Sequence, residues 1–413
     1  MENWKKKTAI FLSSQGISLL GSSLVQYAIM WHITLSTQSG AMMTISIICG
    51  FLPHFIMAPF AGVWADRYDR KKLIILSDGF IAASTLCAAI IFLMGMGELW
   101  MLFAVSSLRA LGGAIQQPAV NAFLPQIVPQ EKLTRVGGLS TSMQSSIMIV
   151  SPMLGALLLS LAPIELIFFV DVITAAAAIL ILSFLLHVRA HEKAKEVQSV
   201  GYFKDMLLGL KYIRSHGYVK RFFMFCAVFY VIVTPTAFLT PLQVARSFNG
   251  GEWHLAAIEV AFSVGMIVGG LLIAAWGGFK NRVHTMVAAS LIFGACAFAI
   301  GVVPVFSLYL VFMAIMGLGM PAFNTPSTVL LQEKVEGEYL GRVFGIFGMI
   351  ATSLMPLSML FYGPLADIVP IETLLIITGP LMVLMGLMML RDRSLVKAGE
   401  PLPKEQPAEA EAI

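Results

Sequence analysis

Three charged side chains lie within long apolar stretches of the sequence, where ionisable groups are rare and could exchange protons. Arg109, Asp171 and Glu259 are each flanked mostly by hydrophobic residues. A carboxyl group shielded from water can bind and release a proton, because desolvation disfavours its charged form. A shielded guanidinium needs a cavity or a partner, because an isolated charge in lipid is costly. All three are candidates for proton coupling, with a structural, hydrogen-bonded charge as the alternative for each.

Other ionisable residues in the apolar stretches are weaker candidates. Asp78 lies nearer the end of its stretch, and we expect it to be a partner for the preceding basic residues rather than a proton carrier. His32 and His54 could pass protons near neutral pH. A single histidine is more often held by one neighbour, which is the alternative for both.

Two stripes of polar residues run along apolar stretches at helical spacing. The first consists of Gln15, Ser18, Ser22 and Gln26, and the second of Ser140, Gln144, Ser151 and Gly155. Because lipid offers no hydrogen bonds, such faces must meet protein or water. We expect them to line a substrate pathway, although they could instead join helix to helix. The candidate pathway residues are Gln15, Ser22, Gln26, Gln116, Gln144, Ser151 and Tyr230.

Several kinds of chemistry have no motif in the sequence. It contains no G-x-x-x-x-G-K-[ST] phosphate loop, no metal-ligand cluster and no nucleophile motif. The four cysteines show neither CxxC spacing nor a disulfide framework. The net charge of +4 is too small to indicate nucleic-acid binding. We therefore expect no enzyme activity, no cofactor and no metal, and a gradient of ions or substrate as the source of energy.

The elements that must position these residues are membrane-spanning helices. Of the 413 residues, 58% are hydrophobic and 12% are charged, which no soluble fold of this length can accommodate. A spanning helix needs about 20 mostly apolar residues. Twelve stretches qualify: 8–34, 42–64, 73–96, 99–122, 138–161, 166–187, 221–245, 254–276, 283–303, 306–330, 341–363 and 373–390.

Charge predicts the orientation of these spans. Nearly all of the 27 Lys and Arg residues fall at the termini or in the even-numbered loops; Arg109 lies in a span and Arg246 in an opposite loop. By the positive-inside rule, both termini and these loops are cytoplasmic. We expect a multi-pass protein of a bacterial inner (cytoplasmic) membrane.

An internal repeat divides the chain. Pro118-Ala-Val-Asn121 recurs as Pro321-Ala-Phe-Asn324, about half of the chain later, and other short matches keep nearly the same offset. This predicts two pseudo-symmetric six-helix bundles, 1–187 and 221–391. The linker 188–220 contains an amphipathic helix at 202–215, expected on the inner membrane surface. The tail 392–413 is rich in Pro, Glu and Ala and is expected to be disordered.

Three motifs carry a resemblance to the major facilitator superfamily. Residues 62–72, Gly-Val-Trp-Ala-Asp-Arg-Tyr-Asp-Arg-Lys-Lys, resemble its loop 2–3 signature, with Asp69 where Gly is usual. Arg109 with Gly113 resembles the span-4 motif that drug exporters link to proton transfer. Ser151-Pro152-Met-Leu-Gly155 looks like a weakened antiporter motif, with Ser before Pro in place of Gly. The resemblance implies the major facilitator fold and an inner gate formed by Gly62, Asp66, Arg67, Arg70 and Lys71.

Further segments resemble the macrolide-efflux proteins of bacteria, from Trp4 to about Arg391. They include Phe51-Leu-Pro53, Asp171-Val172, Phe262-Ser-Val-Gly265-Met266 and Tyr339-Leu-Gly-Arg342-Val343-Phe344. The resemblance implies proton-driven antiport of bulky, weakly basic, lipophilic drugs such as macrolides, and hence antibiotic resistance. Export of a siderophore or another metabolite, a lysolipid flippase, an importer, and a receptor without turnover remain alternatives.

The expected mechanism is alternating access between the two bundles. Asp171 takes a proton while facing outward, and Arg109 tunes the exchange. Asp66, Arg67 and Arg70 latch the inner gate, with Asp66 reaching a helix N-terminus. The expected partners are a small lipophilic substrate, protons and the lipid bilayer, and one chain is expected to function as a monomer. The sequence leaves open which carboxylate couples, the natural substrate and the resting conformation.

Overall fold

The computed structural model describes residues 4–188 and 202–400. Its described part is about 90% helical and contains no strand. Twelve helical segments are long and apolar enough to cross a membrane, which confirms the predicted number of spans. The first six contain α1 (Trp4–Thr37), α2 (Gly40–Arg67), α3 (Arg70–Leu93), α4 (Leu99–Ile127), α5 (Leu133–Leu161) and α6 (Ile164–Leu180). Two short helices adjoin them, the 3₁₀ helix η1 (Gln130–Lys132) and the π-helix η2 (Ile181–Leu185).

The remaining helices follow the linker. They are α7 (Tyr202–Ser215), α8 (Gly217–Phe238), α9 (Thr240–Ser247), α10 (Glu252–Trp276), α11 (Arg282–Val302), α12 (Phe306–Lys334), α13 (Gly337–Ala366), α14 (Ile371–Arg391) and α15 (Arg393–Ala398). The expected span 221–245 is divided into α8 and α9 at Leu239, because Pro241 lies in the first turn of α9 and has no backbone N–H to continue the helix.

Two compact units share this chain. One contains residues 1–199, 238–260 and 356–369, and the other contains 200–237, 261–355 and 370–413. The short segments 238–260 and 356–369 thus belong with the first six helices rather than with their neighbours in sequence. The boundaries of the two predicted six-helix halves stay a prediction.

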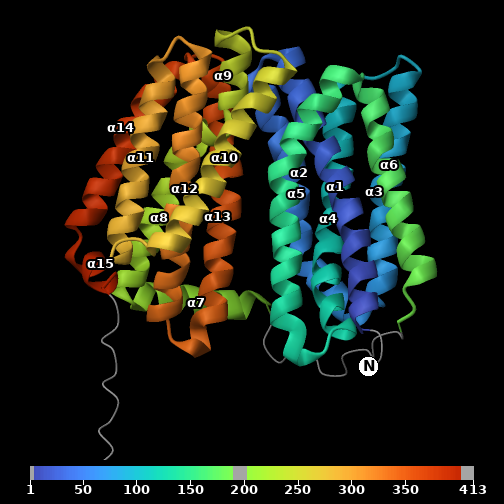
Figure 1. Cartoon of the computed structure of the whole chain (residues 1–413), viewed down its shortest axis with the longest axis horizontal. Helices are drawn as coiled ribbons and strands as arrows, with labels where there is room; N and C mark the ends of the chain where they lie inside the picture. Colours follow the sequence, from blue (N-terminus) through green and yellow to red (C-terminus); the bar gives the residue numbers. More distant parts are fainter. Residues whose placement is uncertain (1–3, 189–201, 401–413) are drawn as a thin grey trace, which may run out of the picture. The chain divides into compact units, whose positions relative to one another are not determined.

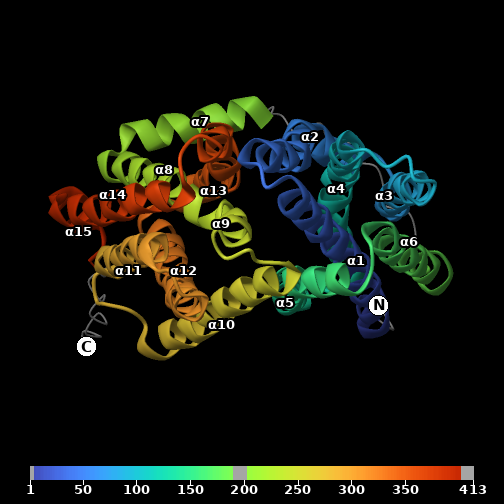
Figure 2. The ribbon, with the colours of Figure 1, turned by 90° about the horizontal axis from the view of Figure 1, so that it is seen from above.

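The first unit is built around α1. Helix α1 packs against α5 and α6, α2 packs against α4, and α3 packs against both α4 and α6. Figures 1 and 2 show α1 to α6 as one bundle of long, roughly aligned helices. Polar caps start two of them: Ser39 accepts a hydrogen bond from the backbone of Met42 at the start of α2, and Asp69 accepts one from Lys72 at the start of α3.

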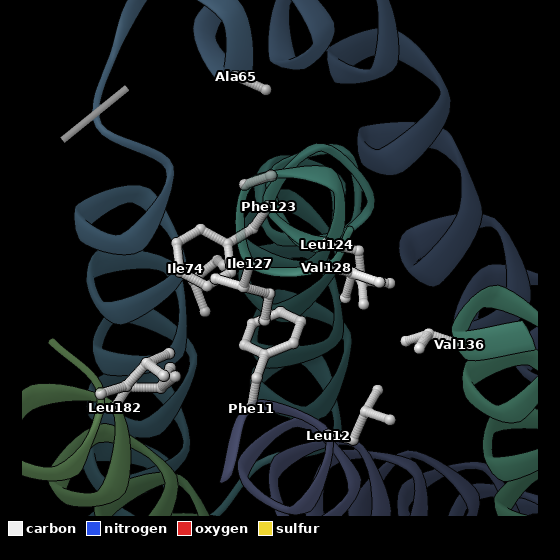
Figure 3. Close-up of a cluster of buried hydrophobic side chains, with 12 residues drawn as sticks. Phe11, Leu12, Ala65, Ile74, Phe123, Leu124, Ile127, Val128, Val136 and Leu182 are labelled. Carbon is white, nitrogen blue, oxygen red and sulfur yellow. The ribbon is translucent and has the colours of Figure 1, made fainter. Parts of the chain in front are cut away.

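An apolar cluster packs the helices of this bundle together at the end where α1 begins. Phe11 of α1 and Phe123 of α4 lie with ring centroids 4.9 Å apart, and Ile74, Ile127 and Leu182 surround them (Figure 3). These side chains come from α1, α3, α4 and η2, so one cluster fixes the relative positions of the helices that carry the site. Within a membrane, such contacts stabilise the bundle through close van der Waals packing rather than through the removal of apolar surface from water.

The second unit contains the predicted amphipathic helix. Helix α7 covers 202–215 as expected, with Leu207 and Leu210 exposed and Tyr212 and Ile213 buried. Tyr212 stacks on Tyr339 with centroids 4.5 Å apart. In Figure 1, α7 runs crosswise to the long helices of its unit. Its placement on the inner membrane surface stays a prediction.

The tail departs from the expectation of disorder. Residues Arg393–Ala398 form α15, and Asp392 caps this helix by accepting hydrogen bonds from the backbone of Ser394 and Leu395. Leu395 is fully buried, and the side-chain amide of Asn281 donates to the Val396 carbonyl at 2.7 Å. The composition of the whole tail concealed this one capped turn. Residues 401–413 lie outside the described part.

Candidate functional site

Four helices of the first unit place two buried carboxylates in successive layers. Asp78 and Thr85 lie two turns apart on α3, Arg109 and Gln116 two turns apart on α4, and Asp171 lies on α6. Helix α1 contributes Ser18 to one layer and Ser22 to the next. Both layers therefore use α1, α3 and α4, and only the Asp171 layer also uses α6; they differ in the charge of the side chain that α4 supplies.

The first layer joins two of the predicted residues, Arg109 and Asp171. Asp171 is 0% exposed and Arg109 is 5% exposed, and they form a short, charge-assisted hydrogen bond through Nη1 and Oδ2. Arg109 also donates to the backbone carbonyl of Ser22 at 2.8 Å and to Thr85 Oγ1 at 2.6 Å. The sequence predicted a partner or a cavity for Arg109 without naming Asp171 as the partner.

Two hydroxyl groups complete the environment of the Asp171 carboxylate. Ser22 Oγ donates to Oδ1 at 2.7 Å, and Thr85 Oγ1 lies 2.8 Å from Oδ2. Both carboxylate oxygens therefore accept hydrogen bonds, and one of them also meets a cation. Each buried charge of the pair is therefore balanced by the other and by hydrogen bonds within the apolar bundle.

The second layer overturns the interpretation of Asp78 as a partner for the basic loop. Asp78 is 1% exposed, and its Oδ1 accepts hydrogen bonds from Ser18 Oγ and from Gln116 Nε2, each at 2.6 Å. Its Oδ2 is buried without a hydrogen-bond partner. Among the described residues, no Lys, Arg or His forms an ion pair with it. The expectation failed because α3 turns Asp78 into the bundle, away from its own basic N-terminus.

The basic residues that follow α2 bind backbone carbonyls instead. Arg70 donates through Nε to the Ala65 carbonyl at 2.9 Å and through Nη1 to the Ala122 carbonyl at 2.7 Å. Lys71 donates to the Leu186 carbonyl at 2.8 Å, beyond the C-terminus of η2. These contacts join α2, α3, α4 and η2 at one end of the bundle.

The helix N-terminus that Asp66 was expected to reach is capped by another acidic residue of this loop. Asp69, not Asp66, caps the N-terminus of α3, which accounts for an acid at the position where the signature usually has Gly. Asp66 is half exposed and lies 3.6 Å from Arg70 Nη2. Arg67 is exposed, and a Cβ at Gly62 would meet no atom within 4 Å. The gating role of these residues stays a prediction.

A cavity of about 250 Å³ lies beside the Asp78 layer. It brings together three of the predicted pathway glutamines, from α1, α4 and α5. Ser140 and Gln144 also hydrogen-bond to each other at 3.3 Å. The full lining consists of Phe11, Leu12, Gln15, Leu19, His54, Gly113, Gln116, Gln117, Val120, Asn121, Ser140, Met143 and Gln144. It includes amides, a hydroxyl, an imidazole and a thioether, but no Lys, Arg, Asp or Glu.

Other predicted pathway residues lie outside this lining. Ser22 belongs to the Asp171 layer, and Gln26 lies against Gly50 of α2. Ser151 is fully buried beside Pro152 in α5. Tyr230, in the other unit, is buried against Phe229. This contact supports a role for Tyr230 in core packing.

Helix α5 approaches α1 closely at Gly155, as its motif predicted. A Cβ at this position would come within 3.3 Å of the Leu24 carbonyl oxygen and of the Tyr27 Cβ. A larger residue would push the two helices apart. Gly155 therefore acts in helix packing.

Glu259 is separate from both carboxylate layers. It is partly buried in α10, and among the described residues it makes no hydrogen bond or ion pair. Its carboxylate lies close enough to Tyr27 of α1 to interact electrostatically. The structure thus brings together Arg109 and Asp171, but not Glu259, from the predicted coupling set.

An ionic cluster at the other end of α2 was not predicted. Asp367, directly after α13, accepts hydrogen bonds from the backbone N–H groups of Gly40 at 2.7 Å and Ala41 at 2.9 Å. Arg246 of α9 pairs with Asp367 at 2.6 Å and donates through Nε to the Gln38 carbonyl at 2.9 Å. The carboxylate therefore caps the positive end of α2 while a guanidinium neutralises it.

This cluster joins segments far apart in sequence. Nearby, Thr44 donates to the Met359 carbonyl at 3.0 Å, and a Cβ at Gly363 would overlap Thr44. Burial by itself would raise the pKa of Asp367. The helix N–H groups, the Ser39 hydroxyl and the guanidinium outweigh that effect and lower the pKa below its ordinary value.

The residues that the sequence missed are Asp78, Thr85, Arg246 and Asp367. A signal existed for the first two, because α3 and α4 each carry polar residues two turns apart on one face, as α1 carries its polar stripe. Arg246 was noticed only as an exception to the charge asymmetry. Nothing near Asp367 in the sequence pointed to α2.

Comparison with known proteins decides the family. A family model described as a transmembrane secretion effector matches residues 6–407. The chain belongs to this family of major facilitator transporters. Macrolide efflux protein A of Streptococcus pyogenes is 32% identical over 385 residues, which cover 92% of this chain and 94% of that protein. Macrolide efflux protein A of Enterococcus faecalis is 34% identical over 325 residues, which cover 78% of this chain and all of that protein.

Solved structures agree on the fold. The crystal structure of a bacterial homologue of the iron transporter ferroportin in an inward-facing state superposes with a TM-score of 0.69 at 15% identity, and covers 94% of this chain and 98% of that one. The expected major facilitator fold and the resemblance to macrolide-efflux proteins are confirmed. This transporter-type chain has twelve spans, and its bacterial relatives place it in the cell membrane.

Proposed function

We propose that this protein exports bulky, lipophilic, neutral or weakly basic molecules, macrolides among them, by proton-coupled antiport with alternating access. The observation that carries the proposal is the similarity to macrolide efflux proteins A over most of the chain. That similarity names a substrate class for the relatives. The geometry of the first unit supplies a cavity and an ionisable network suited to the same class.

The lining of the cavity favours an uncharged or weakly basic, oxygen-rich substrate. Its amide and hydroxyl groups can donate to and accept from ether, ester and hydroxyl groups, while Leu, Phe and Met side chains cover an apolar skeleton. A siderophore rich in carboxylates would meet no cation in this lining. The siderophore alternative is therefore less well supported than the macrolide, as is a lysolipid with its anionic phosphate.

The Arg109–Asp171 pair supports proton coupling. A proton that binds Asp171 removes the negative charge that stabilises the buried guanidinium, so Arg109 must then find another partner. Protonation would therefore change the hydrogen bonds that connect α1, α3, α4 and α6 in this layer. In the proposed cycle, the proton enters from outside by way of the Asp171 layer, where Arg109 tunes the exchange. Glu259, near Tyr27, is a second proposed coupling acid.

Contacts at the two ends of α2 support the alternating part of the proposal. At the predicted cytoplasmic end, Arg70 and Lys71 hold α2, α3 and η2 through backbone carbonyls. At the opposite end, Asp367 and Arg246 tie α2 to α13 and α9. We propose that the first set, with Gly62, Asp66 and Arg67, closes the inner gate, and that the second closes the outer one. One chain contains all these parts, so we expect a functional monomer.

The direct test is uptake of a radiolabelled macrolide, erythromycin, into inside-out membrane vesicles that contain the protein. We expect accumulation when the vesicle interior is acidified, and its loss on addition of a protonophore. Vesicles with the Arg109→Gln variant at matched protein levels provide the control for leakage. Accumulation that does not depend on the proton gradient would contradict proton antiport. If folded protein accumulated none of several macrolides, macrolides would not be its substrates.

A further inference from the structure

In the second carboxylate layer, the binding of a substrate in the cavity can change the protonation state of a buried carboxyl group. We infer that Asp78 carries the exchanged proton, and that the side-chain amide of Gln116 transmits the binding of a hydrogen-bond-donating substrate to it. This inference rests on the proposed antiport and names the residues that link its two halves. It also assigns Asp78 a role that its position in the sequence did not suggest.

Gln116 is the only side chain that both lines the cavity and hydrogen-bonds to Asp78 among the described residues. Its Nε2 donates to Asp78 Oδ1 at 2.6 Å. Its Oε1 accepts no hydrogen bond from the described part of the chain, while the side chain lines the cavity. The oxygen and the nitrogen of a glutamine amide diverge from one carbon, so when one of them faces Asp78 the other is turned toward the cavity.

The protonation state of Asp78 therefore selects the group that Gln116 offers to the cavity. The charged carboxylate accepts from Nε2, which leaves the acceptor Oε1 for the substrate. A protonated Asp78 carries an O–H that must itself donate, and the amide satisfies it by turning Oε1 toward Asp78 and Nε2 toward the cavity. One rotation of a planar group thus exchanges an acceptor site for a donor site.

The sign of this coupling agrees with antiport. A substrate hydroxyl or ammonium group that donates to Oε1 holds Nε2 against Asp78 and favours the carboxylate. The O–H bond of Asp78 then breaks, its electron pair stays on the carboxylate, and the proton passes to water in the cavity. Substrate and proton thereby exclude each other without competing for one atom.

The surroundings of Asp78 favour such an exchange. Its Oδ2 is buried without a hydrogen-bond partner, so an O–H at that position has no acceptor until the carboxyl group turns it toward Gln116. The charged group that acts on it electrostatically is Asp171 of α6, which is paired with Arg109 of α4. His54 on α2 lines the same cavity and is a rival titratable group. Lys71, at the start of α3, is held by the Leu186 carbonyl.

The test is the pH dependence of erythromycin affinity, measured by equilibrium binding to the purified full-length protein in lipid nanodiscs. For the wild type we expect the affinity to rise by about tenfold per pH unit where one proton is released. Asp78→Asn should flatten this slope, after correction for the drug's own amine, which is common to all variants. Gln116→Leu should also flatten it while leaving the acid in place.

Matched variants separate this linkage from a general effect on the cavity. Gln117→Leu removes a neighbouring amide that lines the cavity but does not touch Asp78, and it should keep the wild-type slope. His54→Gln should keep it as well. A wild-type slope in both Asp78→Asn and Gln116→Leu, or its loss in His54→Gln, would overturn the inference. A wild type whose affinity has no pH dependence, together with transport that ignores the gradient, would instead remove the proposed antiport.

Discussion

Asp171 and Asp78 are two buried carboxylates of one helix bundle that differ in a single kind of partner. Each accepts a hydrogen bond from a serine of α1, and each meets a side chain of α4. That side chain is Arg109 for Asp171 and Gln116 for Asp78. Both oxygens of Asp171 have partners, whereas one oxygen of Asp78 has none.

The difference shows how one helix bundle can use one carboxylate to join helices and another to exchange a proton. The Arg109 guanidinium and the Asp171 carboxylate tie their helices together, because neither charge can be lost without leaving the other buried and unpaired. A neutral amide leaves its carboxylate free to change state, because it can donate to the charged form or accept from the protonated form. The first arrangement suits a structural switch that opens rarely, and the second suits exchange in every cycle.

The largest difference between the two sites should be the loss of stability when the carboxylate is replaced by an amide. We expect Asp171→Asn to lower the free energy of unfolding by about 3–5 kcal/mol, because Arg109 is left buried without a counter-charge. Asp78→Asn should cost about 1 kcal/mol or less, because an amide still accepts from Ser18 and Gln116. Thermal and denaturant unfolding of the purified variants in one detergent measures both values.

The double variant Arg109→Gln/Asp171→Asn provides the control for that comparison. It recreates a neutral layer that resembles the one around Asp78, and it should recover most of the stability lost in Asp171→Asn. Equal losses for Asp171→Asn and Asp78→Asn would show that the guanidinium does not distinguish the layers.

Much of this arrangement follows from the sequence, but not the pairing. Twelve spans, the amphipathic helix 202–215 and the need of Arg109 for a partner come from local composition and the cost of burying charge. The identity of that partner depends on how α4 and α6 are rotated and packed, which is determined by contacts such as Phe11 with Phe123. Asp78 was misjudged for the same reason, since closeness in sequence to a basic loop does not fix the direction of a side chain.

A third carboxylate, Asp367, extends the comparison to a partly exposed site with a cation. Because its pKa is lowered in the folded protein, it contributes stability above the ordinary carboxyl pKa of about 4. That contribution is lost as the pH falls through its lowered value. We expect Asp367→Asn to cost about 1 kcal/mol at pH 7, after allowance for solvent screening, and progressively less in acid.

Unfolding of the wild type and Asp367→Asn across this pH range measures the effect. Glu98→Gln is the matched control, because Glu98 stands at the N-cap of α4 without a side-chain capping bond. If Glu98→Gln were as costly as Asp367→Asn, or the cost of the latter grew in acid, the cluster would not stabilise the end of α2.

The two serines of α1 should give the smallest effects. Ser18→Ala and Ser22→Ala each remove one hydrogen bond to a carboxylate and should each cost about 0.5–1 kcal/mol. Their effects on binding should differ: Ser18→Ala shifts the pH at which erythromycin affinity changes, whereas Ser22→Ala leaves that pH in place. A shift in Ser22→Ala alone would reverse the assignment of the two layers.

The central claim is that Asp78 changes protonation with drug binding while Asp171 stays ionised beside Arg109. Infrared difference spectroscopy of the protein in lipid, before and after addition of erythromycin, observes the carboxyl groups directly. We expect drug binding to remove a protonated-carboxyl C=O band in the wild type, and this change to be absent in Asp78→Asn and in Gln116→Leu. The same band change in Asp78→Asn, or its disappearance only in Asp171→Asn, would contradict the account.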